Sequence, residues 1–114
     1  MKQLALTVNL VDNPDAISRY LNYHENIWPE VSEALLAVGI HQMRIWKKGR
    51  RLFMFIETDD AFDVETDFAR YLDLDPRCQE WEDLMTTFQE PVTEAGPGEK
   101  WTVMDEIFHL TETK

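Results

Sequence analysis

Residues 40–57 read IHQMRIWKKGRRLFMFIE, and this stretch decides the fold. Two runs rich in β-branched and aromatic residues, 40–46 and 52–57, flank a basic turn centred on Gly49. Such runs joined by a short turn are typical of a β-hairpin. The cluster of basic side chains is therefore interpreted as the solvated tip of the hairpin and not as a binding patch. Its members are Lys47, Lys48, Arg50 and Arg51.

The segments before this hairpin show a strand pattern followed by a helix pattern. Apolar residues recur at every second position over 4–10, which predicts a strand. A helix is expected over 14–23, followed by a break near Asn26 and a second helical segment over 29–38. Each helical segment starts with a proline, which is favoured in a first helical turn, and Gly39 ends the second one.

The segments after the hairpin complete the order of elements. The acidic stretch 60–73 has apolar residues at loose helical spacing, and Pro76 opens a clearer helix that carries Trp81 on its apolar side. Residues 91–100 are interpreted as a loop and 101–110 as a last strand. The resulting order, β-α-β-β-α-β, predicts an α+β fold of the ferredoxin-like type: a four-stranded antiparallel sheet with helices on one face.

The length and the patterning of the strands bear on assembly. A chain of 114 residues predicts a single domain that spans 1–114. Its strands are apolar on both faces, whereas the helices of so small a domain can cover only one. We therefore expect a homodimer packed sheet against sheet, in the manner of a dimeric α+β barrel.

Composition and charge exclude several classes of function. The net charge of −11 argues against binding to nucleic acid or to an anionic membrane, since both are bound through lysine and arginine. The short apolar run at the N-terminus cannot span a bilayer, and no cleavage site follows it. The single cysteine, Cys78, excludes an intramolecular disulfide framework and a cysteine metal cluster. We expect a soluble, cytoplasmic protein.

One histidine stands out as a candidate for proton transfer. His24 lies in YLNYHENIWPEV, residues 20–31, one helical turn after Tyr20, so both rings are expected on one face. Its imidazole titrates near neutral pH and can give or take a proton. A histidine hydrogen-bonded at a helix end is the alternative. The three histidines, at positions 24, 41 and 109, show no metal-binding spacing, and no phosphate-binding loop is present.

Five further residues are candidates for a site. Trp81 is either part of the core or a platform for the apolar face of a sugar, and Glu82 is expected to be solvated. Asp105 and Glu106 are expected on opposite faces of the last strand, where a buried carboxylate needs a partner. Arg44, placed in a central strand, is the obvious cation for one of them, either as a structural ion pair or as a substrate clamp.

Four stretches of the chain resemble the L-rhamnose mutarotase family, including its fucose-type relatives. They are H-x-x-I-W-P-E at 24–30, GIH at 39–41, CQEWEDLM at 78–85 and MDEIFHL at 104–110. The resemblance runs from the first strand to the last. It implies a dimeric ferredoxin-like fold and an enzyme that interconverts sugar anomers without a metal or another cofactor.

The resemblance also implies roles for individual residues. His24 takes the place of the acid/base residue, and Tyr20 and Trp81 take places that contact sugar. Two sugar-contacting positions depart from the family, because Met43 stands where the family has a tyrosine and Glu82 where it has a second tryptophan. We therefore expect a mutarotase for a 6-deoxyhexose, either L-fucose or L-rhamnose.

Several alternatives stay open at this stage. The second acid/base group is either Tyr20 or a carboxylate such as Glu106, and the sequence does not choose between them. The same dimeric architecture also supports small monooxygenases. A sugar-binding module without catalytic activity is a further possibility, which would leave the anomers to exchange at the spontaneous rate.

Overall fold

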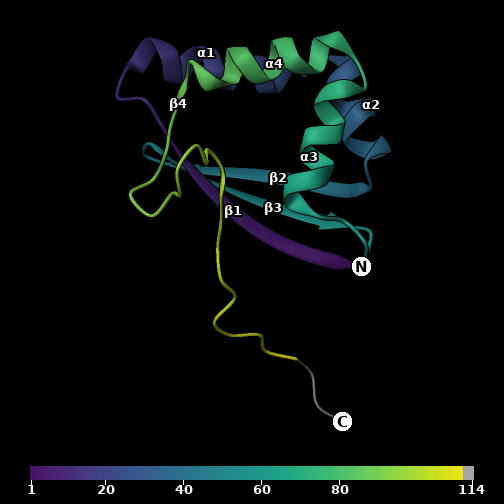
Figure 1. Ribbon diagram of the computed structural model, residues 1–114. Coiled ribbons are helices and arrows are strands. Elements are labelled where there is room, and N and C mark those ends of the chain that lie inside the picture. The colour runs from purple at the N-terminus through teal and green to yellow at the C-terminus, as the bar shows by residue number, and fades with distance from the viewer. Residues whose placement is uncertain (112–114) are drawn as a thin grey trace.

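An antiparallel sheet forms the base of the molecule in the computed structural model, which describes residues 1–111 (Figure 1). The first strand pairs with the second strand of the hairpin along almost its whole length, with Leu6 opposite Met54. The strand order is β2-β3-β1-β4, and β5 pairs with β1 beside β4. The strands are β1 (Lys2–Leu10), β2 (Ile40–Lys48), β3 (Arg51–Thr58), β4 (Gln89–Glu90) and β5 (Thr102–Val103).

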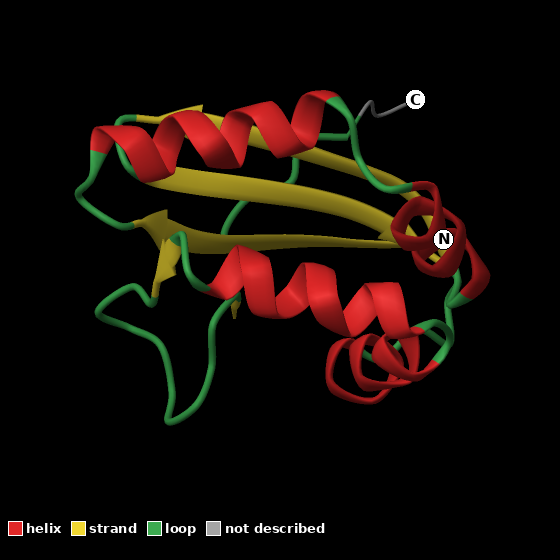
Figure 2. Ribbon diagram, turned by 90° about the horizontal axis from the view of Figure 1, so that it is seen from above, coloured by secondary structure: helices red, strands yellow, loops and turns green. Residues whose placement is uncertain are grey.

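Four helices cover one face of this sheet, two of them running nearly along the strand direction (Figures 1 and 2). Asparagine or aspartate caps three of them; the Asn13 side chain, for example, accepts hydrogen bonds from the backbone of Asp15 and Ala16. Within residues 1–111, no helix is both long and apolar enough to cross a membrane. The helices are α1 (Pro14–Glu25), α2 (Pro29–Ala37), α3 (Val64–Asp73) and α4 (Pro76–Thr86).

The hydrophobic core lies between the helices and the sheet. Alternate residues of β1 and β3, such as Leu6, Val8 and Ile56, are at most 1% exposed, and Tyr20 and Trp81 pack onto them from the helices. Burial of alternate residues is what one covered sheet face requires. The predicted ferredoxin-like α+β fold, with its helices on one face, is confirmed.

The opposite face of the sheet is left open by all four helices of residues 1–111 (Figure 2). Phe53 and Phe55 are half-buried there, and Trp46 remains 44% exposed. The guanidinium of Arg44 lies 4.6 Å from the centre of the Trp46 ring. Arg44 was expected in a central strand, but β2 forms the edge of the sheet.

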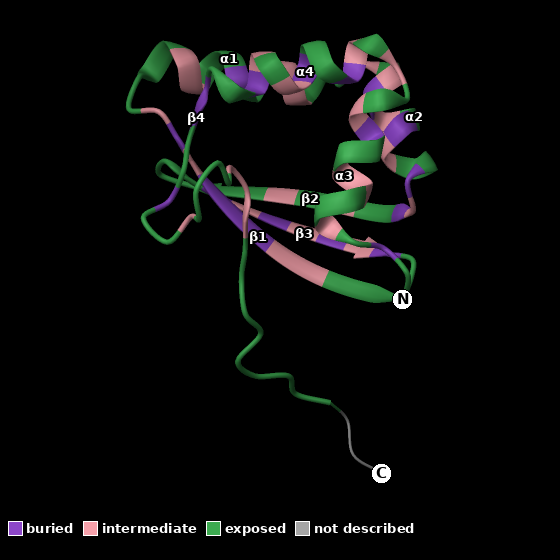
Figure 3. Ribbon diagram, in the orientation of Figure 1, coloured by how far each residue is buried: buried purple, intermediate pink, exposed green. Residues whose placement is uncertain are grey.

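The prediction of a last strand over 101–110 is wrong for most of that stretch. Only Thr102 and Val103 form β5, and the Met104 amide makes one more hydrogen bond to the Ala5 carbonyl. The chain then leaves the sheet and stays exposed (Figure 3). Ile107 and Phe108 are 95% and 76% exposed. The edge of β1 is not used up, because β4 pairs only with Asn9 and Leu10 and β5 only with Leu6 and Thr7. The chain turns away from the sheet after Met104, so the alternating pattern of 101–110 is not used for strand pairing.

Gly39 has a positive φ, a backbone conformation that residues other than glycine rarely adopt. Its φ is +101°, and an added Cβ would lie 2.7 Å from Oδ2 of Asp59. Gly49, at the hairpin tip, has a φ of +58° and open space around it.

We expect Gly39→Ala to lower the free energy of unfolding by about 1–3 kcal/mol, because strain and the contact with Asp59 combine.

Urea unfolding at one fixed protein concentration measures this effect. Gly49→Ala is the matched control and should cost about 1 kcal/mol at most, since only the left-handed conformation opposes it. Equal losses in the two variants would contradict the role given to the contact with Asp59.

Candidate active site

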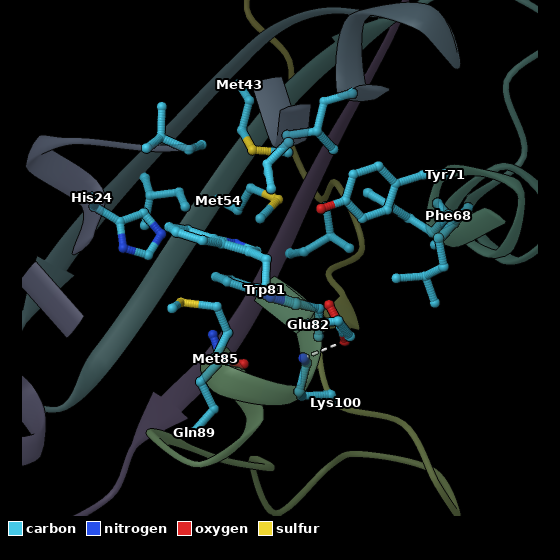
Figure 4. A pocket seen from close by; sticks show the side chains of 18 of the residues that line it. His24, Met43, Met54, Phe68, Tyr71, Trp81, Glu82, Met85, Gln89 and Lys100 are labelled. Atoms are coloured by element: carbon cyan, nitrogen blue, oxygen red, sulfur yellow. Dashed lines mark hydrogen bonds and ion pairs between the residues drawn. The ribbon is translucent and has the colours of Figure 1, made fainter. Parts of the chain in front are cut away.

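A pocket of about 410 Å³ lies between the sheet and the helices (Figure 4). Tyr20 and His24 of α1 line it, together with Trp81 of α4 and Met43 and Met54 of the sheet. Most of the lining is apolar or aromatic, and a few polar groups point inward. Such a lining suits an uncharged small molecule with both apolar faces and hydroxyl groups.

His24 lies in the last turn of α1 with its tautomer fixed. Its Nδ1 is 2.9 Å from the backbone carbonyl oxygen of Tyr20, one turn earlier. A carbonyl can only accept, so Nδ1 carries the hydrogen, and in the neutral ring Nε2 keeps a lone pair. Nε2 is thus the atom of His24 that can take a proton.

Aromatic rings surround this imidazole. The centres of the Tyr20 and His24 rings are 4.2 Å apart, and those of His24 and Trp81 are 5.4 Å apart. Burial among these groups lowers the pKa of His24 below its ordinary 6.5, and the hydrogen bond to the Tyr20 carbonyl only partly opposes that change. His24 is therefore largely neutral at pH 7 and ready to act as a base.

Tyr20 lies beside His24 and next to the side chain of Gln89 of β4. Burial raises the pKa of the Tyr20 phenol to about 12, partly offset by a hydrogen bond with the Gln89 side chain. Gln89 is only 9% exposed, and its Oε1 has no hydrogen-bond partner within residues 1–111. A buried acceptor of this kind favours a ligand that can donate a hydrogen bond.

Trp81 is held rigidly between the two ends of the pocket. It is 6% exposed, and the ring centres of Tyr23 and Trp28 lie 6.1 Å and 5.1 Å from its own. The guanidinium of Arg77 in turn stacks 3.7 Å from the centre of the Trp28 ring. The two predictions for Trp81 are therefore compatible, because it belongs to the core and also forms a wall of the pocket.

The far end of the pocket is polar and draws on elements distant in the sequence. Glu82, next to Trp81 on α4, forms an ion pair with Lys100 of the loop before β5. Lys100 also donates to Oγ1 of Thr86, 3.1 Å away. Tyr71 of α3 points its hydroxyl into the same region (Figure 4).

Five of the residues singled out in the sequence line this one pocket: Tyr20, His24, Met43, Trp81 and Glu82. Three do not. Arg44 projects from the uncovered face of the sheet. Asp105 and Glu106 were expected on opposite faces of the last strand, but both lie in the exposed C-terminal segment outside β5, where the Glu106 carboxylate is 3.2 Å from Nδ1 of His109. Among the described residues, no three metal-ligating side chains gather at one place.

Sequence reasoning missed three polar residues of the pocket: Tyr71, Gln89 and Lys100. Tyr71 lies in an acidic helix with weak periodicity, and Lys100 closes a stretch that was interpreted only as a loop. Gln89 begins a two-residue strand. Their positions in the chain gave no sign that they meet.

The fold and the pocket together define a class: small ferredoxin-like α+β proteins with a pocket built around one partly buried histidine and aromatic rings. Residues 3–110 match the family model for L-rhamnose mutarotase. An L-fucose mutarotase from Xanthomonas campestris is 36% identical over 98% of this chain and 90% of its own length. The chain belongs to the L-rhamnose mutarotase family, and the members of this family are isomerases.

Two solved structures share the fold. The L-rhamnose mutarotase of Formosa agariphila superposes with a TM-score of 0.68 at 19% identity, covering 97% of this chain and all of its own. A dimeric ferredoxin-like protein from an uncultured marine organism has a TM-score of 0.56 at 12% identity, over 96% and 98% of the two chains. These likenesses support the overall fold described above.

The environment of His24 leads to a prediction for its titration. We expect its pKa to lie below 6.5 in the folded protein, because the aromatic pocket opposes the charged form. NMR titration of the imidazole resonances measures this midpoint, and ¹⁵N shifts of the neutral ring should identify the Nδ1–H tautomer. In urea-unfolded protein the midpoint should return to about 6.5. An Nε2–H tautomer would contradict the hydrogen bond to Tyr20.

Proposed function

We propose that the protein interconverts the α and β anomers of a 6-deoxyhexose, L-fucose or L-rhamnose. The observation that carries this proposal is the hydrogen bond of His24 Nδ1 to the Tyr20 carbonyl, which leaves Nε2 as the proton acceptor of an imidazole that lines an aromatic pocket. Family membership and the similarity to an L-fucose mutarotase give independent support to the proposal. The pocket's apolar walls suit the C–H faces and the methyl group of such a sugar.

In the proposed reaction, the sugar loses one proton from its C1 hydroxyl and gains another at its ring oxygen. Nε2 of His24 takes the proton of the C1 hydroxyl while the C1–O5 bond breaks, and Tyr20 gives a proton to the ring oxygen. With a pKa of about 12, the Tyr20 phenol stays protonated at neutral pH, yet it can protonate the much more basic alkoxide that leaves. The open-chain aldehyde then rotates about C1–C2, and the reverse transfers close the ring on the other face.

This mechanism uses Tyr20, and not Glu106, as the second acid/base group. Tyr20 stacks on His24 inside the pocket, whereas Glu106 of the same chain lies in the exposed C-terminal segment. No step of the proposal uses a metal or another cofactor. Of the alternatives, a monooxygenase and a sugar-binding module without catalysis lack the support that the family gives to the isomerase.

We also propose that two copies associate through the uncovered face of the sheet. Trp46, Phe53 and Phe55 form an apolar surface there that none of the helices α1 to α4 covers. The ferredoxin-like protein that shares the fold is described as dimeric. The exposed apolar side chains at 104–110 give a second copy further surface to bury. A cytoplasmic location stays a prediction.

The catalytic proposal predicts accelerated anomer exchange. NMR saturation transfer between the α and β anomeric protons, with micromolar protein, should show faster exchange of L-fucose or L-rhamnose. His24→Gln should slow the catalysed rate by about 10²–10⁴, the usual contribution of one positioned proton transfer. His41→Gln is the control, since His41 pairs with Asp59 outside this pocket. Full activity in a folded His24→Gln variant would contradict the mechanism.

The dimer proposal predicts that a charged residue placed on the uncovered face of the sheet halves the molecular mass of the protein in solution. Light scattering after size exclusion should give twice the chain mass for the wild type and a single chain mass for Phe55→Glu, because a carboxylate in that interface loses its hydration. Leu36→Glu places the same charge on the exposed side of α2 and should remain dimeric. A monomeric wild type would exclude the proposal.

A further inference from the structure

The pocket has two separate polar ends, and the mechanism uses only one. His24 lies at one end with Tyr20 beside it, whereas the Glu82–Lys100 pair and Tyr71 line the side beyond Trp81 (Figure 4). The three distal residues come from α3, α4 and the loop before β5. They are called the distal cluster below.

The ion pair between Glu82 and Lys100 lies at the wall of the pocket. The Lys100 side chain is 19% exposed and that of Glu82 is 36% exposed, and both residues line the cavity. The charges of the two partners cancel, so this end of the pocket remains suited to a neutral ligand.

The cluster also retains unused hydrogen-bonding groups. Within the described chain, the ammonium of Lys100 donates to Glu82 and Thr86, which leaves one of its three N–H groups for a ligand. One carboxylate oxygen of Glu82 accepts no hydrogen bond from residues 1–111. The pair therefore presents a donor and an acceptor side by side, which is what a hydroxyl group needs.

Tyr71 adds a hydroxyl to the same place. It is 5% exposed at the pocket wall. Burial raises the pKa of its phenol, and the Cys78 thiol and the Glu82 carboxylate raise it further, so the group stays neutral.

The geometry of a pyranose decides which part of the sugar reaches the cluster. In the six-membered ring, C4 lies directly across from C1. When the C1 hydroxyl meets Nε2 of His24, the 4-hydroxyl is therefore the substituent carried furthest toward the opposite end of the pocket. L-Fucose and L-rhamnose differ in configuration at C2 and C4, so a group that binds the 4-hydroxyl can distinguish them.

We infer that Tyr71, Glu82 and Lys100 form a subsite that binds the 4-hydroxyl of the sugar and selects its configuration. This inference rests on the proposed function for the identity of the ligand. Lys100 donates to the hydroxyl oxygen, and the free carboxylate oxygen of Glu82 accepts its hydrogen. Met43, at the wall contributed by the sheet, supplies only an apolar contact.

The test measures binding separately from catalysis. Methyl α-L-fucopyranoside cannot open its ring, so its dissociation constant reports binding alone. We expect Lys100→Met to weaken its binding about tenfold, the usual effect of losing a hydrogen bond to a charged group. Tyr71→Phe should weaken it about threefold, because a neutral hydrogen bond is worth less. Glu80 is an exposed residue of α4, the helix that carries Glu82, and Glu80→Gln should leave the dissociation constant unchanged.

The 4-deoxy analogue of the same glycoside decides the assignment. Lys100→Met should change its dissociation constant by less than about twofold, since the partner hydroxyl is absent. Equal losses for both glycosides would show that Lys100 only supports the loop and would overturn the inference. No loss for either glycoside would also overturn it, as would failure of the wild type to bind both the fucoside and methyl α-L-rhamnopyranoside. Anomer exchange is measured separately, so a protein that binds the glycoside through Lys100 but leaves exchange at the spontaneous rate would refute only the catalytic proposal.

Discussion

The hydrogen bond from Nδ1 of His24 to the Tyr20 carbonyl is the constraint on which the site depends. It fixes the tautomer, and it places Nε2 as the only proton acceptor of the ring. It also requires that His24 and Tyr20 be one turn apart on a helix, with that helix packed against the sheet. The Asn13 cap and the proline that follows it start α1 at the register that meets this requirement.

The aromatic rings around His24 have two consequences that act together. They bury the imidazole, which lowers its pKa and keeps it neutral at pH 7, and they form the apolar walls against which a sugar ring can lie. A more open site would give a histidine that is partly charged and a sugar that is held less firmly. Packing within the core therefore sets the proton chemistry as well as the shape of the pocket.

The sequence predicted most of the fold because its signals are local. Alternation over 4–10, the hairpin at 40–57 and the prolines that open three of the helices each depend on neighbouring residues only. The pairing of Tyr20 with His24 follows from helical spacing in the same way. The prediction for 101–110 failed because an apolar, alternating pattern does not say which surface covers it. Gln89, Lys100 and Tyr71 could not be found, since their meeting depends on how β4, a loop and α3 pack in three dimensions.

The two departures from the family pattern belong to one physical change. With Met43 in place of a tyrosine, the sheet offers an apolar contact where the resemblance implies a hydroxyl. With Glu82 in place of a tryptophan, α4 carries a carboxylate, which would be costly in an aromatic pocket without a partner. Lys100 supplies that partner from a loop 18 residues away in the sequence. The polar side chains of the pocket thus come from the helical layer and a loop and not from Met43 of the sheet, while His24 and Tyr20 are retained. If the two proposals hold, the groups that transfer protons are separate from the groups that choose the sugar.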